Sequence, residues 1–199
     1  MFYNCRSLTT FEGKTLDNLD NGEMMFCDCY SFESFHNHLG NLTKNSMMFY
    51  NCDSMINFNS TLPKIKKPNQ MFEGCNKLRS YYCVHTGINS EAYLLLPSSK
   101  NSLEIFESNL PNLTDSTSMF YDCIALKNCV IKINGVTNGT LMFYNCTSLN
   151  VLDLESLNLQ NATSMFYNCT SLNYETMSID SHFKNVTVAD KMFYNSGLS

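Results

Sequence analysis

The sequence is poor in charge, and positive charge is especially scarce. Only 16% of its 199 residues are charged, against roughly 25% in an average globular protein. The formal net charge is −5, and the only basic cluster is Lys64, Lys66 and Lys67. Because proteins that bind nucleic acid neutralise its phosphates with clustered Lys and Arg, we expect no nucleic-acid partner.

Long apolar segments are also missing. No stretch approaches the ~18 consecutive apolar residues of a transmembrane helix, and the richest one, from Ala92 to Leu96, stops at Pro97. The first residues, Met1 to Cys5, have neither the basic nor the apolar segment of a signal peptide. We therefore expect no transmembrane segment in this chain.

Sequence signatures of catalysis are absent as well. The motifs G-x-S-x-G, H-E-x-x-H and G-x-G-x-x-G do not occur. Gly13-Lys14-Thr15 resembles the end of a phosphate-binding loop, but Leu8 stands where that loop requires its first glycine. We expect no enzymatic activity and no cofactor.

An internal repeat dominates what is present. The dipeptide Met-Phe recurs with spacings of 24, 23, 23, 48, 23, 23 and 27 residues, beginning at Met1, Met25, Met48, Met71, Met119, Met142, Met165 and Met192. The gap of 48 holds two periods, with Leu96 in place of Met and with Leu103 and Phe106 at the expected offsets. The sequence predicts one solenoid over residues 1–199, with about eight coils of 23–24 residues and an eroded repeat at about 84–118.

Each copy predicts one short parallel strand and one short helical or 3₁₀ turn. A cysteine follows each Met of seven copies by four residues, and Leu149, Leu152 and Leu154 form the L-x-x-L-x-L core of a leucine-rich repeat. Residues that cap helices precede most Met-Phe pairs by two positions: Ser46, Asn69, Thr117, Thr140, Thr163 and Asp190. Three positions after the Met come mostly Asn and Asp, which tolerate positive φ. We expect the Phe side chains to be buried in register, from Phe2 onward.

The pattern Met-Phe-x-x-Cys-x-Ser-Leu, nearly whole at Met1, Met142 and Met165, resembles the BspA-like leucine-rich repeats. It is especially similar to the repeat of mycoplasma surface lipoproteins. The resemblance covers essentially the whole chain and implies an extracellular or cell-surface protein implicated in adhesion. The family has no shared catalytic residues, so the resemblance is specific for fold more than for function.

The ten cysteines allow three interpretations. Equal positions in successive coils are close enough for disulfides, but their parallel Cβ vectors fit a disulfide poorly. Cys27-Asp28-Cys29 with His36-Asn37-His38 offers zinc-type donors, yet Cys29 belongs to the repeated core position. We favour free interior thiols and no metal, with Cys27 alone able to reach solvent.

Eight N-x-T sequons begin at Asn41, Asn59, Asn112, Asn138, Asn145, Asn161, Asn168 and Asn185. The chain is rich in Asn, Ser and Thr, and the repeat multiplies whatever it contains. We interpret most of these sequons as composition rather than as glycosylation sites.

The outward strand positions, nine and eleven residues after each Met, are the candidate binding residues, because packing does not fix their identity. Those selected are Glu12, His36, Asn59, Tyr82, Glu107, Asp153 and Tyr174. They predict a binding module for a protein or glycan. A structural spacer is the alternative, because no capping repeat is visible and bare coil edges favour flanking repeats or end-to-end self-association. The free thiols also permit an intracellular scaffold.

Overall fold

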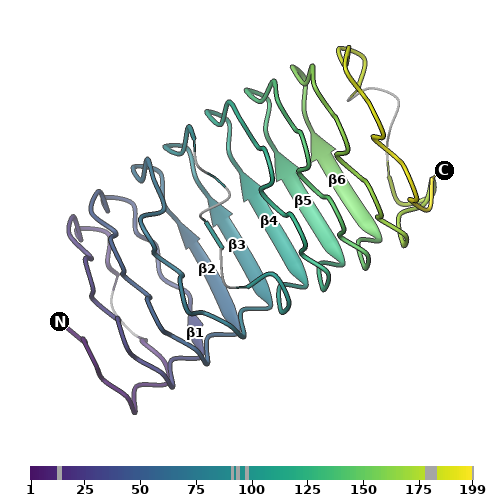
Figure 1. Cartoon of the computed structure of the whole chain (residues 1–199). Coiled ribbons are helices and arrows are strands. Elements are labelled where there is room, and N and C mark those ends of the chain that lie inside the picture. Colours follow the sequence, from purple (N-terminus) through teal and green to yellow (C-terminus); the bar gives the residue numbers. More distant parts are fainter. Residues whose placement is uncertain (13–14, 91, 93–94, 97–98, 178–182, 199) are drawn as a thin grey trace.

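The chain winds into a solenoid whose coils stack side by side (Figure 1). The computed structural model describes residues 1–12, 15–90, 92, 95–96, 99–177 and 183–198. One sheet of six parallel strands runs along the solenoid in chain order. The strands are β1 (Ser34–Phe35), β2 (Asn57–Thr61), β3 (Ser80–Val84), β4 (Ile105–Asn109), β5 (Asn128–Lys132) and β6 (Val151–Glu155).

The strands pair as the repeat predicts, one strand to a coil. Phe58 is opposite Tyr81, Tyr81 is opposite Phe106, and so on to Leu152. The parallel solenoid is therefore confirmed, although the number of strands is smaller than the expected number of coils. Beyond β1 and β6 the described residues continue the sheet only as the single bridges Thr10↔Ser34 and Leu152↔Met177. An end coil has a partner on one side alone, which leaves less pairing to hold an extended strand.

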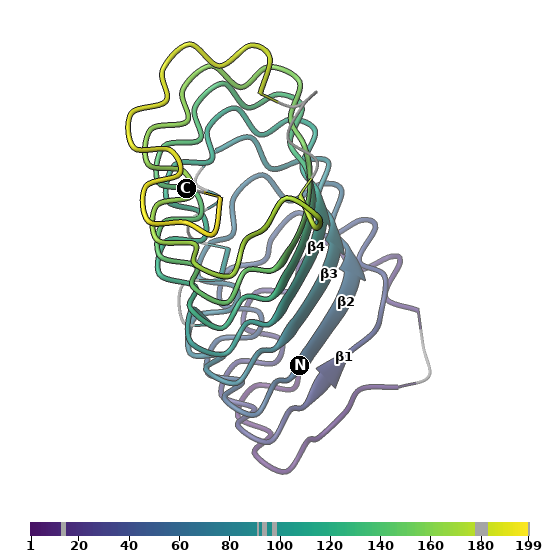
Figure 2. The same ribbon diagram turned by 90° about the vertical axis from the view of Figure 1, so that its right-hand side faces the viewer.

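The Met-Phe segment forms consecutive tight turns on the side of each coil away from the strands (Figure 2). In the second coil the N–H groups of Cys27 and Cys29 bond the carbonyls three residues back, at 3.3 and 3.2 Å. Hydrogen bonds to the carbonyl three residues back are typical of a 3₁₀-helix. Met24 and Asp28, however, have left-handed φ angles of 51° and 60°, which end the turn on both sides. The described residues accordingly contain no α-helix.

These left-handed residues are stabilised by bonds between coils. The N–H groups of Met24, Phe26 and Asp28 donate to carbonyls of the next coil at 2.9, 2.9 and 2.8 Å. Asn and Asp mark the second left-handed position in the sequence, as expected. The left-handed position before each Met was not predicted, because the residue types there do not favour positive φ. These residues are Met24, Met47, Gln70, Ser118, Leu141, Ser164 and Lys191.

In three copies the capping residue lies two positions before the one that the sequence predicted. Asn138 Oδ1 accepts hydrogen bonds from the N–H (3.2 Å) and the hydroxyl (2.7 Å) of Thr140. Asp115 and Asn161 accept the equivalent N–H bond. The prediction placed the acceptor on Thr140 itself, whereas a short Asx side chain reaches the amide two residues onward.

Aromatic rings form the centre of the core. Six Phe rings of the Met-Phe pairs are buried: Phe26, Phe49, Phe72, Phe120, Phe143 and Phe166. Neighbouring rings stack nearly parallel, with centroids 5.4 Å apart for Phe26 and Phe49 and for Phe143 and Phe166. Phe2 is only half-buried, contrary to expectation, because the described chain places a coil on one face of it alone.

The repeated cysteine is a buried hydrogen-bond donor. The Cys146 thiol donates to the Phe120 carbonyl at 3.1 Å, and the Cys169 thiol to the Phe143 carbonyl at 3.0 Å. All ten cysteines are free. The prediction for Cys27 was wrong: it is 3% exposed, whereas Cys5 is exposed because it stands at the first coil.

One buried pair departs from the apolar core. Tyr81 and His85 are fully buried under β3, and the Tyr81 hydroxyl hydrogen-bonds His85 Nε2. His85 Nδ1 has no hydrogen-bond partner. Burial lowers the pKa of His85 to about 3. The imidazole is therefore neutral at physiological pH.

Several sequons have structural roles. In Asn41-Leu42-Thr43 the amide of Asn41 donates to the Asp17 carbonyl at 2.6 Å, Leu42 is buried, and the Thr43 hydroxyl bonds the Asp20 carbonyl at 3.4 Å. Asn112 and Asn185 make the same bond to the preceding coil. In these three sequons the N-x-T pattern therefore joins one coil to the next.

Candidate binding face on the strands

The outward side chains of the sheet form three parallel columns. Residues alternate between core and surface along a strand, so each five-residue strand presents its first, third and fifth side chains. The middle column is set by the pairing of the sheet and consists of Asn59, Tyr82, Glu107, Val130 and Asp153. The structure thus brings four of the predicted residues into one row, where Asn59, Glu107 and Asp153 are exposed and Tyr82 is half-buried.

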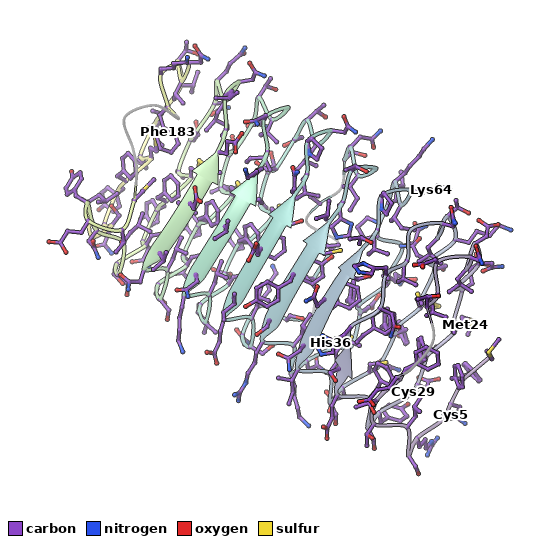
Figure 3. The ribbon with its side chains drawn as sticks, turned by 180° about the vertical axis from the view of Figure 1, so that it is seen from behind. Cys5, Met24, Cys29, His36, Lys64 and Phe183 are labelled. Atoms are coloured by element: carbon purple, nitrogen blue, oxygen red, sulfur yellow. The ribbon has the colours of Figure 1, made fainter. Side chains whose placement is uncertain are left out.

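Glu12 and His36 lie at the first-coil end of this face. Both are exposed, and together with Thr10 and Ser34 they line a shallow hollow of about 240 Å³. His36 follows β1 directly, as Figure 3 shows. These two residues therefore extend the middle column beyond the paired strands.

Tyr174 is not part of the sheet, contrary to the expectation for its spacing. It lies in a turn and is 70% exposed, with its hydroxyl donating to the Leu198 carbonyl at 2.9 Å. Asn173 Oδ1 accepts the N–H groups of Glu175 and Thr176 at 3.0 and 3.2 Å and creates this turn. The bridge to Leu152 consequently falls at Met177.

A wider hollow of about 410 Å³ lies between the middle and last columns, over β2 to β5. Its outward-facing lining combines apolar and hydrogen-bonding groups: His38, Asn59, Thr61, Tyr82, Val84, Glu107, Asn109, Val130 and Lys132. This volume lies within the range of about 300–1,000 Å³ typical of ligand sites. The hollow is the strongest candidate site on the described surface.

Exposed and half-buried apolar side chains are spread over the outward face of β3 to β6, in and near this hollow. Val84 and Val151 are 42% and 38% exposed, and Ile105 and Val130 are half-buried. In the sheet, Glu107 lies between Tyr82 and Val130, and Asn128 lies between Ile105 and Val151, so apolar and polar side chains alternate across the strands. We call this set, Tyr82, Val84, Ile105, Val130 and Val151, the apolar centre.

Charged pairs surround the apolar centre. Lys132 Nζ is 3.1 Å from Glu155 Oε2 at one end of the strands. At the other end Glu104 lies 2.9 Å from Lys127 Nζ and 3.9 Å from Arg79 Nε. The hydrogen bond from Lys127 holds the pKa of Glu104 below its ordinary value. The rim is therefore charged but locally balanced.

The last outward column was missed by the sequence reasoning. It contains Thr61, Val84, Asn109, Lys132 and Glu155. Only positions nine and eleven after each Met were considered, whereas strands of five residues add position thirteen. Continuing the alternation by one more step would have identified it.

The described residues suggest no metal centre. They contain no group of three or more His, Cys, Asp or Glu side chains that could hold a metal ion. Cys29 of the zinc-type cluster is buried, and its thiol donates to the Phe2 carbonyl at 3.0 Å. The outward face offers instead a mixed apolar and polar surface suited to non-covalent recognition.

Comparison with known proteins adds the family. Residues 1–116 match the BspA type leucine rich repeat region, and residues 95–198 match a Mycoplasma protein family of unknown function, DUF285. No curated protein and no solved structure gives a significant match. Within the described part of the chain, no helix is long and apolar enough to cross a membrane. Because the first match covers more than half of the chain, the protein belongs to the BspA-type leucine-rich repeat family.

Proposed function

We propose that the protein is a non-enzymatic binding module of the cell surface or extracellular space, and that its strand face recognises another protein. The family supports a surface location, since BspA-type repeats are generally associated with surface and adhesion proteins. The outward columns support the recognition role because their side chains vary while the buried positions repeat.

The observation that carries this proposal is the mixed outward face, where the exposed apolar side chains of the apolar centre alternate with polar ones and charged pairs lie at both ends of the strands. Protein interfaces combine a central apolar area, where aromatic side chains act as anchors, with a polar and solvated rim. Tyr82 occupies the middle of such an arrangement, between Asn59 and Glu107 in the neighbouring strands. A protein partner would cover Val84 and Val151, which otherwise remain in contact with water.

Site-specific photo-crosslinking tests the proposal. A photoreactive amino acid placed at Tyr82 should capture a defined protein from a preparation of extracellular or cell-surface proteins. The same group at Tyr144, half-buried in a Met-Phe turn, should not capture it. With the captured partner purified, Tyr82→Ala should weaken its binding about fivefold or more, while Tyr144→Ala should have little effect.

The spacer hypothesis predicts a different result. A spacer would give no partner-specific crosslink from Tyr82, and its function would survive replacement of Val84 and Val130 by Asp. Capture from Tyr144 in preference to Tyr82 would place the binding surface on the turns and contradict the strand-face proposal. Binding of an oligosaccharide in place of a protein, lost in Tyr82→Ala, would retain the face but change its ligand.

A further inference from the structure

A second hollow lies away from the strand face and gathers the basic cluster of the sequence. It has a volume of about 500 Å³ and is lined by Thr43, Asn45, Lys64, Lys66, Lys67 and Asn69. It follows the carboxyl end of β2, and Lys64 projects from this edge of the solenoid in Figure 3. We call these six residues the lysine hollow.

The fold fixes the direction of the lysines. Ile65 is buried between Lys64 and Lys66, so the two flanking side chains point outward together. Pro68 is buried on the other side of Lys67. The segment is thus anchored at two points, and its amines are directed to one side of the coil.

The floor of the hollow is organised before any ligand arrives. Asn45 is 1% exposed, and its amide donates to the carbonyls of Lys67 and Pro68 at 3.1 and 3.0 Å. Lys64 Nζ donates to Asn41 Oδ1 in the neighbouring coil at 2.6 Å. These bonds limit the motion of the lysine segment, which reduces the entropy lost on binding.

The hollow carries a strong local excess of positive charge in a chain whose net charge is −5. None of the described residues that line it is acidic, and Lys44 lies exposed in the adjoining coil. The Asn45 amide donates to backbone carbonyls and the Thr43 hydroxyl to the Asp20 carboxylate, so the binding chemistry of the hollow comes from its ammonium groups. This chemistry fits sulfate or phosphate groups.

We propose that the lysine hollow binds the sulfate groups of a sulfated polysaccharide. A flat anionic bilayer fits less well, because the exposed Asp17 and Asp20 lie in the preceding coil, against Asn41 and Thr43, and would meet the bilayer too. Nucleic acid fits less well because no described lining residue is aromatic, so bases have nothing to stack on. A flexible sulfated chain can engage the lysine segment and stay clear of the Thr43 edge of the hollow, where Asp20 accepts the Thr43 hydroxyl.

Titration with heparin tests this site. The intact chain should bind heparin at low ionic strength and should not bind chemically desulfated heparin. Counterion release makes the affinity fall steeply with salt for each ammonium engaged. Lys64→Gln with Lys66→Gln should lower the affinity about tenfold or more and reduce the slope of log affinity against log salt by about two.

The matched control removes two positive charges elsewhere. Lys77 and Lys127 form exposed ion pairs with Asp53 and Glu104, so the variant with both changed to Gln should fold normally. It should keep the heparin affinity of the wild type within about twofold, and so should Tyr82→Ala, which tests the strand face alone. Circular dichroism should show the same spectrum for all variants.

Three results would overturn the proposal. The first is no heparin binding at low salt. The second is equal loss in the lysine variant and its control, which would indicate attraction to the whole molecule. The third is equally tight, lysine-dependent binding to vesicles with anionic lipid or to duplex DNA, which would assign the hollow to that partner.

Discussion

The repeated cysteine acts as a hydrogen-bond donor in the core. The thiols of Cys52, Cys146 and Cys169 each donate to a Phe carbonyl of the preceding coil. That carbonyl already accepts the N–H of the cysteine in its own coil. The thiol satisfies the second lone pair, so its protonated form is part of the structure.

Thiol reactivity should therefore separate Cys5 from the other cysteines. Burial raises the pKa of Cys27 to about 11 and that of Cys169 to about 12, and thiolate is the reactive form. A short pulse of iodoacetamide on the native protein, read by mass spectrometry, should modify Cys5 first and the buried thiols only after unfolding. Cys5→Ser should abolish the fast phase, and rapid modification of Cys146 would contradict the buried donor role.

For single residues, the sequence predicted the position within a coil better than the exposure of the side chain. Cys5 and Cys27 differ in exposure because of what covers them, and covering depends on the coils on either side. The spacing of residues within one copy of the repeat does not show which coils cover a side chain. For the same reason Tyr174 was placed on the face by its offset from Met165, although the local Asx turn at Asn173 moves it out of register.

The Phe stack is the element that joins the coils. Phe143 is buried between Phe120 and Phe166, with ring centroids 5.1 and 5.4 Å away. Deletion of such a ring removes contacts on both faces and leaves a cavity. The stack is thus an apolar link between successive coils from Phe2 to Phe72 and again from Phe120 to Phe193.

Replacement of one ring should therefore have a cost that depends on its place in the stack. Phe143→Ala should lower the free energy of unfolding by about 3–5 kcal/mol, whereas Phe2→Ala should cost clearly less because Phe2 is half-buried. Denaturant titration measures both, and Phe143→Leu serves as the conservative control. Equal losses at Phe2 and Phe143 would refute the two-sided stacking argument.

The strands were predictable because the buried residue types repeat about every 23 residues. The geometry of the turns was not predictable. The parallel strands follow from the offsets of Leu149, Leu152 and Leu154. The left-handed conformation of Met24 and Leu141 is stabilised by hydrogen bonds to the next coil. Such bonds exist only once the coils have stacked, so local preference gives no sign of them.

The whole solenoid depends on its central coils, because each coil contacts only its neighbours. The buried Tyr81–His85 pair lies in one of these coils, under β3, with β2 and β4 on either side. Unfolding releases the imidazole to its ordinary pKa near 6.5, above its folded value of about 3. Between these values the unfolded chain binds more protons, so stability falls as the pH is lowered.

Acid should thus destabilise the molecule through His85. Below about pH 6.5 the free energy of unfolding should fall by up to about 1.4 kcal/mol per pH unit from this group. Tyr81→Phe with His85→Leu, which copies Phe58 and Leu62 of the preceding coil, should remove this contribution. Thermal unfolding between pH 4 and 8 compares the two proteins. Parallel pH profiles would show that His85 does not titrate on unfolding.

The outward columns of the sheet have an evolutionary consequence. Each five-residue strand presents three side chains whose replacement disturbs neither the Phe stack nor the buried thiols. Mutations there cost little stability, and recombination between copies of similar length preserves the register. Selection can therefore revise this surface one coil at a time, so that related chains diverge in what they contact while inheriting an unchanged scaffold.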